Sequence, residues 1–343
     1  MNIRSWLFAG ITLCLSLSWA AHAGDRNIVI LATGGKIAGS AETQTQAGYT
    51  SCQVGVETLL AAVPQLKQIA SVTGEQVANV GSQDMNDEIW LKLADRVNAL
   101  AASSKVDGIV ITHGTDTIEE TAYFLDLVTP RGKPVVLTAA MRPSTALSAD
   151  GPLNILNAVA VAADDAARGR GVLVVVNDDI HAAKAITKTH TTDVQTFASP
   201  ERGLVGRSLY GENTFFAASD AGGTADSEFS LGKVNSLPRV DVLYMHANFS
   251  ADLIDSAVAN GAQGLVIAGV GNGNMTGSAL AAVKRAIEKG VVVVRSSRVP
   301  SGPTGRNVEV RDDEVGTVAS RDHNPAKARV LLMLALLSTQ DSK

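Results

Sequence analysis

The stretch DGIVITHGTDTIEETAYFL, residues 107–125, decides the fold. Its first part is apolar and β-branched, as in a buried strand, and its last part places apolar residues at helical spacing. Between them, residues 112–117 predict a tight turn from a strand end into a helix start. In an open parallel sheet, ligands bind at the carboxyl ends of strands, so this turn is expected to face a binding site.

Two interpretations of this turn are open. Thr117 and Glu120 have the spacing of a capping box, and Asp116 would interact favourably with the helix dipole. A capping box does not explain why Thr115 and Asp116 lie together at a strand end. The alternative is a functional site, with a hydroxyl and a carboxylate beside the free N–H groups of a helix N-terminus.

Length and composition set the broad class of protein. The chain has 343 residues, of which 45% are hydrophobic and 18% charged, and a net charge of −5. This length is typical of about two domains with a large buried core. Because the charge is negative and no basic run occurs, the sequence argues against nucleic-acid and anionic membrane partners.

Residues 1–23 are predicted to be a signal peptide. Arg4 supplies the positive charge, residues 6–20 are apolar but too short for a comfortable membrane span, and Ala21-His22-Ala23 fits the cleavage rule. Export to a periplasm is therefore expected. Only Cys52 remains after cleavage, so no internal disulfide forms, and no Cys or His spacing predicts a metal site.

Alternating strand and helix patterns predict an α/β protein with mainly parallel sheets. A large N-terminal domain with a doubly wound sheet is expected over 24–216, a linker over 217–238 and a smaller C-terminal α/β domain over 239–343. The expected strands are 27–32, 76–80, about 107–112, 134–138, 171–176, 240–244, 264–268 and 291–295. The expected helices are 56–66, 87–100, 118–128, 153–167, 251–260, 278–289 and 325–337.

Polar side chains that suit acyl transfer gather in the loops of the first domain. Thr33, Ser82, Gln83, Thr115 and Asp116 follow predicted strands, and Lys188 lies in a hydroxyl-rich segment. A threonine hydroxyl needs a base, and a desolvated lysine can serve as one. Thr115, Lys188 and Asp116 are therefore predicted to form a triad that activates a nucleophile or water.

With these residues, the sequence resembles the bacterial type II L-asparaginases over nearly all of the mature chain. The motif THGTDTxEET is highly specific for them. The matching segments are ILATGGKIAG (30–39), GSQDMND (81–87), VITHGTDTIEETAYFLDL (110–127), MRPSTALSADGPLN (141–154), TKTHTTDV (187–194), GVGNGN (269–274), RSSRVPSG (295–302) and NPAKARVLL (324–332).

The resemblance implies hydrolysis of L-asparagine to L-aspartate and ammonia without a cofactor, in a homotetramer of intimate dimers. Each site would lie between the large domain of one subunit and the small domain of its neighbour. Ser82, Gln83 and Asp116 would bind the α-carboxylate and α-amine of the substrate, and Thr115 and Lys188 would handle protons. Tyr49 would lie on a lid formed by residues 40–52, and the neighbouring subunit would supply Asn274 and Glu309.

Lys36 departs from the family pattern. The family loop reads TGGT, and its second threonine is the nucleophile; here that position is Lys36. An ammonium with an ordinary pKa, held protonated by Glu309, has no lone pair with which to attack. A neutral lysine would form a stable amide and stop turnover.

Three interpretations of this departure remain open. The first is a family hydrolase by descent with severely reduced or lost activity. In the second, Thr115 is the nucleophile, Lys188 is the base, and useful turnover persists. The third is a periplasmic amino-acid (asparagine or aspartate) binding or regulatory protein on the same scaffold. In all three, the pocket for an α-amino acid is expected to be intact.

Overall fold

The computed structural model describes residues 26–46, 48–216, 229–232 and 234–338. The predicted signal peptide and the greater part of the predicted linker, residues 217–228 and 233, lie outside these described residues. Within the described part of the chain, no helix is both long enough and apolar enough to cross a membrane.

The large domain is built on an eight-stranded sheet with the order β10-β9-β6-β5-β4-β3-β1-β2. Strands β1 to β5 pair in parallel, whereas β6, β9 and β10 extend the sheet in antiparallel fashion. The strands are β1 (Asn27–Gly34), β2 (Ser71–Val80), β3 (Gly108–Thr112), β4 (Val135–Thr138), β5 (Val172–Val176), β6 (Asp179–Ala182), β9 (Gly206–Leu209) and β10 (Glu212–Phe215).

The antiparallel edge was not predicted from the sequence, although local turn signals exist. Asn177 and Asp178 join β5 to β6, and Tyr210 and Gly211 join β9 to β10, all four with positive φ. Two-residue hairpin turns of this kind favour Asn, Asp and Gly because these residues tolerate the left-handed region.

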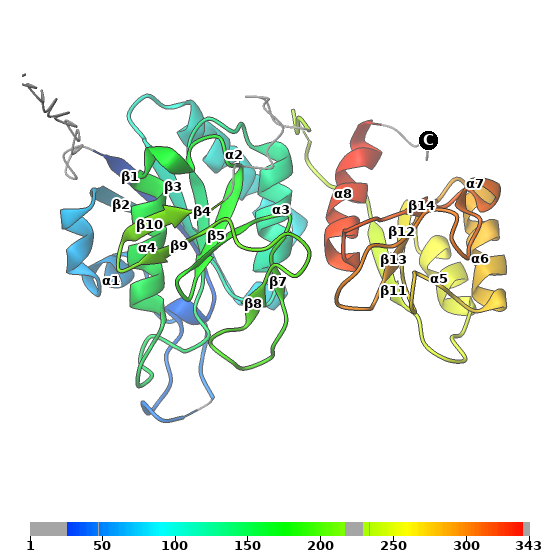
Figure 1. Cartoon of the computed structure of the whole chain (residues 1–343), viewed down its shortest axis with the longest axis horizontal. Coiled ribbons are helices and arrows are strands. Elements are labelled where there is room, and N and C mark those ends of the chain that lie inside the picture. The colour runs from blue at the N-terminus through cyan, green and yellow to red at the C-terminus, as the bar shows by residue number, and fades with distance from the viewer. Residues whose placement is uncertain (1–25, 47, 217–228, 233, 339–343) are drawn as a thin grey trace, which may run out of the picture.

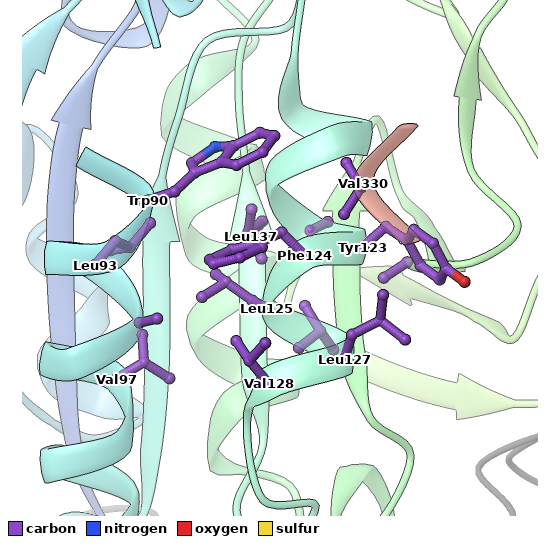
Figure 2. Packing of buried hydrophobic residues seen from close by; sticks show 14 of the residues in the cluster. Trp90, Leu93, Val97, Tyr123, Phe124, Leu125, Leu127, Val128, Leu137 and Val330 are labelled. Atoms are coloured by element: carbon purple, nitrogen blue, oxygen red, sulfur yellow. The ribbon is translucent and has the colours of Figure 1, made fainter. Parts of the chain in front are cut away.

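Helices cover both faces of the large sheet, which confirms the doubly wound architecture (Figure 1). Along β1, Val29 and Leu31 contact one hydrophobic core, while Ile28 and Ile30 contact the other. In the first core, which Figure 2 shows from close by, the Trp90 ring stacks on that of Phe124 with centroids 5.0 Å apart. The helices are α2 (Asp87–Ala102) and α3 (Ile118–Val128) on the first face, and α1 (Val56–Ala61) and α4 (Gly151–Ala163) on the second.

Two predicted helices are shorter in the structure. The helix expected over 56–66 ends at Ala61, and Pro64 begins a separate 3₁₀ turn, η2 (Pro64–Gln68). A proline disfavours helical backbone in the residue before it. The helix expected over 153–167 ends at Ala163, because the Asp164 carboxylate accepts a bond from the Ala166 N–H and starts η4 (Asp165–Ala167).

The small domain has a parallel four-stranded sheet in the order β11-β12-β13-β14, so the predicted second α/β unit is confirmed. Its strands are β11 (Val240–Tyr244), β12 (Gly264–Gly269), β13 (Val292–Ser297) and β14 (Val318–Ala319). Its helices are α5 (Asp252–Ala259), α6 (Gly277–Glu288), α7 (Asp312–Val315) and α8 (Pro325–Ser338).

Helix α8 packs on the small sheet and also against α3, so it joins the two domains (Figure 1). The buried Lys327 ammonium donates a hydrogen bond to the Ile186 carbonyl and lies 3.6 Å from the Glu119 carboxylate. The Tyr123 hydroxyl and the His323 ring share a 2.7 Å hydrogen bond across the same boundary. Ile186 directly precedes the hairpin of β7 (Thr187–Lys188) and β8 (Phe197–Ala198), so α8 also supports the segment that carries Lys188.

Candidate functional site

Three loops meet at the carboxyl ends of β1, β2 and β3 without room for side chains between them. A Cβ on Gly35 would lie 2.5 Å from the Gly114 Cα, and Gly35 has a φ of +81°. A Cβ on Gly114 would in turn lie 2.6 Å from the Ser82 Oγ. Glycine at these two positions therefore lets the loops that carry Lys36, Ser82 and Thr115 approach closely.

Lys188 connects the two candidate catalytic residues of the central turn. Its ammonium lies 3.0 Å from the Thr115 Oγ1 and 2.5 Å from the Asp116 Oδ1. The Thr115 hydroxyl also lies 3.5 Å from the same Asp116 oxygen. The hydrogen bond from Lys188 holds the pKa of Asp116 below its ordinary value, so the carboxylate stays ionised near neutral pH.

Ser82 organises the turn through both its side chain and its backbone. The Asp116 N–H donates to the Ser82 Oγ over 3.1 Å, and the Thr117 hydroxyl donates to the Ser82 carbonyl over 2.7 Å. The capping-box interpretation is therefore wrong: Thr117 occupies the N-cap position of α3, but its side chain makes no capping hydrogen bond. Glu120 lies 3.8 Å from Arg329 of α8 and takes part in the domain boundary instead.

Gln83 lies at the exposed rim of this cluster. Its amide donates to the Asp84 carboxylate over 3.2 Å. The predicted role of Gln83 in binding the α-carboxylate thus rests on the resemblance.

Lys36 begins the short turn η1 (Lys36–Ala38), and its ammonium lies 4.6 Å from the centre of the Tyr49 ring. Ser40 and Thr50 form a β-bridge that closes the base of the loop carrying Tyr49. A cation over an aromatic face is attracted to it, so Lys36 and Tyr49 hold the loop against η1.

The pKa of Lys36 differs from its expected ordinary value. Burial lowers it, and the neighbouring Lys188 ammonium lowers it further, while Asp116 and Asp150 oppose the shift. The ordinary pKa expected for Lys36 does not hold in the fold, because burial and the neighbouring charges, neither of which the sequence shows, decide the shift. Asp150 was also not anticipated; both its oxygens accept bonds from the N–H groups of Met141 and Arg142.

Two other polar residues near the turn have structural partners. The buried Thr33 hydroxyl donates to the Thr112 carbonyl over 3.0 Å, a contact within the protein. The ring of His113 bonds the Gly114 carbonyl at 2.8 Å and the Thr121 hydroxyl at 3.0 Å. Burial lowers the pKa of His113 to about 4, so it is neutral and structural at neutral pH.

Asn274 and Glu309 lie together in the small domain. The Asn274 amide donates to the exposed Glu309 carboxylate over 2.7 Å. Cys52, in the loop of Tyr49, is a free thiol with a φ of +64°. In the described part of the chain, no three His, Cys, Asp or Glu side chains converge so that they could hold a metal ion.

Comparison with known proteins covers both domains. A family model described as "Asparaginase, N-terminal" matches residues 27–220, and "Glutaminase/Asparaginase C-terminal domain" matches residues 239–343. "Probable L-asparaginase periplasmic" of Haemophilus influenzae is 50% identical over 96% of this chain and 94% of its own. "L-asparaginase 2" of Escherichia coli is 52% identical over 92% of this chain and 90% of its own.

A solved structure has the same fold over nearly the same length. The "Probable Cytoplasmic L-asparaginase from Campylobacter jejuni" matches with a TM-score of 0.88 and 43% identity, covering 92% of this chain and 97% of its own. Since two family models and relatives at about 50% identity span both domains and the loops that meet at the site, the chain belongs to the asparaginase family and is an asparaginase-type amidohydrolase.

Proposed function

We propose that this protein hydrolyses the side-chain amide of L-asparagine to L-aspartate and ammonia, without a cofactor. The observation that carries the proposal is the Lys188 ammonium, placed within hydrogen-bond reach of both Thr115 and Asp116 at the strand ends. The names of the Haemophilus and Escherichia relatives support L-asparagine as the substrate.

The substrate's α-amino group would pair with Asp116. One oxygen of this carboxylate bonds Lys188, but its side chain is 55% exposed, so the second oxygen is accessible to an ammonium. Ser82 and Gln83 would bind the α-carboxylate from the neighbouring loop. This arrangement would direct the side-chain amide towards Thr115 and Lys36, which lie on the loops pressed together by Gly35 and Gly114.

Because Lys36 occupies the position of the family's nucleophilic threonine, the parent protein would depend for a slow catalytic step on the hydroxyl of Thr115 and the amine of Lys188. In its neutral form, Lys188 would take the proton from the hydroxyl as oxygen attacks the amide carbon, and would then return a proton to the leaving ammonia. The resulting ester would be hydrolysed by water activated in the same way. The 3.0 Å distance between the two side chains allows direct proton transfer.

Lys36 would reduce turnover, because it occupies the position at which the resembling enzymes carry a nucleophilic threonine. Protonated, it has no lone pair and places a cation beside Lys188, which disfavours any further positive charge there. Neutral, it would form an amide that water does not release. Because its pKa is lowered, Lys36 is neutral, and so able to form this amide, more often than an ordinary lysine is.

A second candidate function is binding of L-asparagine or L-aspartate without turnover. The Lys36 ammonium favours it, because a cation that contacts the Tyr49 ring and feels the charges of Lys188 and Asp116 stands where the resembling enzymes have a nucleophilic hydroxyl. Release of ammonia by the purified protein given L-asparagine separates the two functions, since a binding protein releases none.

Replacing Asp116 with alanine is expected to abolish binding of L-aspartate, through loss of the charge partner for the α-amine. Calorimetry measures the affinity of both proteins. Asp255→Ala is the matched control, since Asp255 likewise pairs with a cation, the Arg285 guanidinium at 2.6 Å, but lies on α5 in the small domain. Equal affinity in Asp116→Ala and the parent protein would contradict the assigned role.

The functional unit is proposed to be a homotetramer of intimate dimers. Asn274 and Glu309 would then reach the site of a neighbouring subunit, so that a monomer would be incomplete. Light scattering at micromolar concentration should give a mass near four chains, about 140 kDa from the 35.6 kDa of the full chain. A monodisperse monomer would exclude the shared site.

Export to the periplasm is proposed from residues 1–23, and the name of the Haemophilus relative supports it. Mass spectrometry of the secreted protein should find Gly24 at the N-terminus. A protein that starts at Met1 in a periplasmic extract would show that cleavage after Ala23 does not occur.

A further inference from the structure

A single arginine lies within strand β13, between three valines and two serines, and is completely buried. Arg295 is 0% exposed, and its acid partner Asp312, at the start of α7, is 1% exposed. The Nε of Arg295 donates to one Asp312 oxygen over 2.7 Å, and its Nη2 donates to the other over 2.8 Å. Such a fork-to-fork pair fixes the direction of both side chains as well as their separation.

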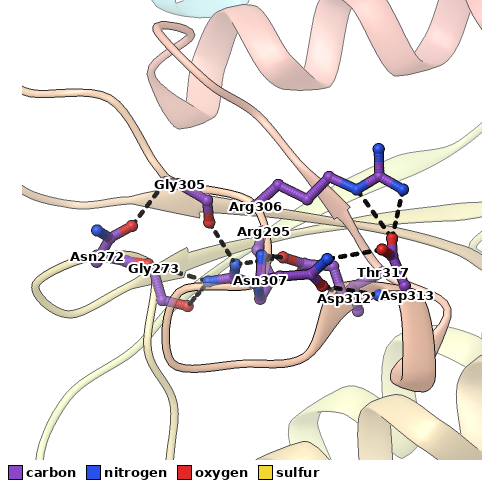
Figure 3. A network of polar contacts seen from close by, with 9 residues as sticks. All are labelled: Asn272, Gly273, Arg295, Gly305, Arg306, Asn307, Asp312, Asp313 and Thr317. Atoms are coloured by element: carbon purple, nitrogen blue, oxygen red, sulfur yellow. Dashed lines mark hydrogen bonds and ion pairs between the residues drawn. The ribbon is translucent and has the colours of Figure 1, made fainter.

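The remaining donors of Arg295 bind backbone carbonyls of two loops (Figure 3). One terminal nitrogen donates to Asn272 over 3.0 Å and Gly273 over 3.1 Å, and the other donates to Gly305 over 3.0 Å. With the two bonds to Asp312, all five N–H donors of the guanidinium are used. Gly273 must lack a side chain here, because a Cβ would lie 2.9 Å from the guanidinium.

Asp312 holds the second loop from the other side. Its oxygens also accept bonds from the Asn307 N–H over 2.8 Å and from the Thr317 hydroxyl over 2.6 Å. One buried ion pair therefore fixes residues 269–274, which end in Asn274, and residues 305–312, which include Glu309. The two loops also contact each other directly, since the Gly305 N–H donates to the Asn272 side chain over 2.7 Å.

We infer that Arg295 and Asp312 are positioning residues that orient the Asn274–Glu309 pair for contact with substrate. This inference rests on the proposed function, in which that pair completes a site. Asn274 directly follows the clamped Gly273, and Glu309 lies between the clamped Gly305 and Asp312. Without this clamp, the loops that carry the half-buried Asn274 and the exposed Glu309 would sample more orientations, and a displacement of about 1 Å can cost roughly 100-fold in rate.

The test is calorimetric binding of L-aspartate to the assembled protein. Arg295→Lys keeps the charge but supplies fewer donors in a different geometry, and is expected to weaken binding about tenfold or more with unchanged circular dichroism and mass. The matched control is Arg285→Lys, which alters an exposed arginine–aspartate pair of the same domain and should retain the parent affinity.

A double-mutant cycle separates positioning from general stabilisation. Asn274→Ala should weaken binding on its own, and adding Arg295→Lys to it should cause little further loss, because both changes remove the same contact. A lowered melting temperature with unchanged affinity in Arg295→Lys, or losses that multiply in the double variant, would overturn the inference. Thr317→Val replaces Arg295→Lys if the latter does not fold; it removes one bond to Asp312 and should weaken binding a few-fold.

The same binding measurements distinguish failure of this inference from failure of the proposed function. If Asp116→Ala retains the parent affinity, the proposed binding site is wrong, and the inference is overturned with it. If Asp116→Ala abolishes binding but Asn274→Ala or the positioning variant retains the parent affinity, the binding site stands and only the inference is overturned.

Discussion

Replacing Lys36 with threonine is expected to raise kcat for L-asparagine by roughly 10³- to 10⁶-fold, the range by which loss of a nucleophile slows a preorganised hydrolase. The substitution places a hydroxyl on the glycine-rich turn beside Tyr49 and removes a cation beside Lys188. KM should change less, because Ser82 and Asp116 are untouched. Ammonia release under steady-state conditions measures both constants.

A second variant separates the effect of adding a hydroxyl from the effect of removing the charge. Lys36→Met removes the cation but adds no hydroxyl, so it should gain far less activity than Lys36→Thr. Equal gains in the two variants would show that the cation alone suppresses turnover. If the parent protein already turns over briskly and Lys36→Thr stays within a few-fold of it, then Thr115 or Thr33 is the nucleophile and Lys36 does not cripple the enzyme.

Replacing Thr115 with valine is expected to lower kcat by at least about 10²- to 10⁴-fold, both in the parent protein and in Lys36→Thr. Valine keeps the shape of the side chain but removes the hydroxyl that lies 3.0 Å from the Lys188 ammonium, and proton transfer of this kind contributes that much to rate. Stopped-flow or coupled ammonia assays measure the loss.

The matched control for this change is Thr33→Val. Its hydroxyl is buried and donates to the Thr112 carbonyl, so its loss should cost about 1 kcal/mol of stability while leaving kcat almost unchanged. A Thr115→Val protein that keeps parent-like turnover would remove Thr115 from the mechanism. A large loss of kcat in Thr33→Val, without a matching loss of fold, would instead assign the chemistry to Thr33.

Much of the fold and part of the candidate site could be predicted from local sequence. The apolar run before residue 112 and the helical spacing after 117 placed Thr115 and Asp116 at a strand end, because side-chain periodicity is a local property. Alternating strand and helix patterns predicted both parallel sheets for the same reason. The hairpin strands β6, β9 and β10 were missed because each has only four residues and carries a weak pattern.

The partners of individual polar groups depended on residues distant in the chain. In one of the two interpretations Thr117 capped its own helix, but its hydroxyl bonds the Ser82 carbonyl, 35 residues away. An arginine directly after a run of valines was the only local sequence signal for the Arg295 clamp, whose carbonyl acceptors come from two separate loops. A buried polar group bonds the partners that the fold brings near it, and these can be distant in the sequence.

The sequence by itself determined the two α/β domains, the hydroxyl and carboxylate at a strand end, and the presence of Lys36 on the glycine-rich turn. The triad of Thr115, Lys188 and Asp116 was predicted from residue types, but only the tertiary structure gave the geometry by which Lys188 bonds Asp116 across 72 residues. The tertiary structure alone also showed that Lys36 lies half-buried near both charges, with a lowered pKa. The physical reason is that periodicity and turn chemistry act between near neighbours in the chain. Burial and charge–charge interactions instead depend on distance in space, which the folded chain alone defines.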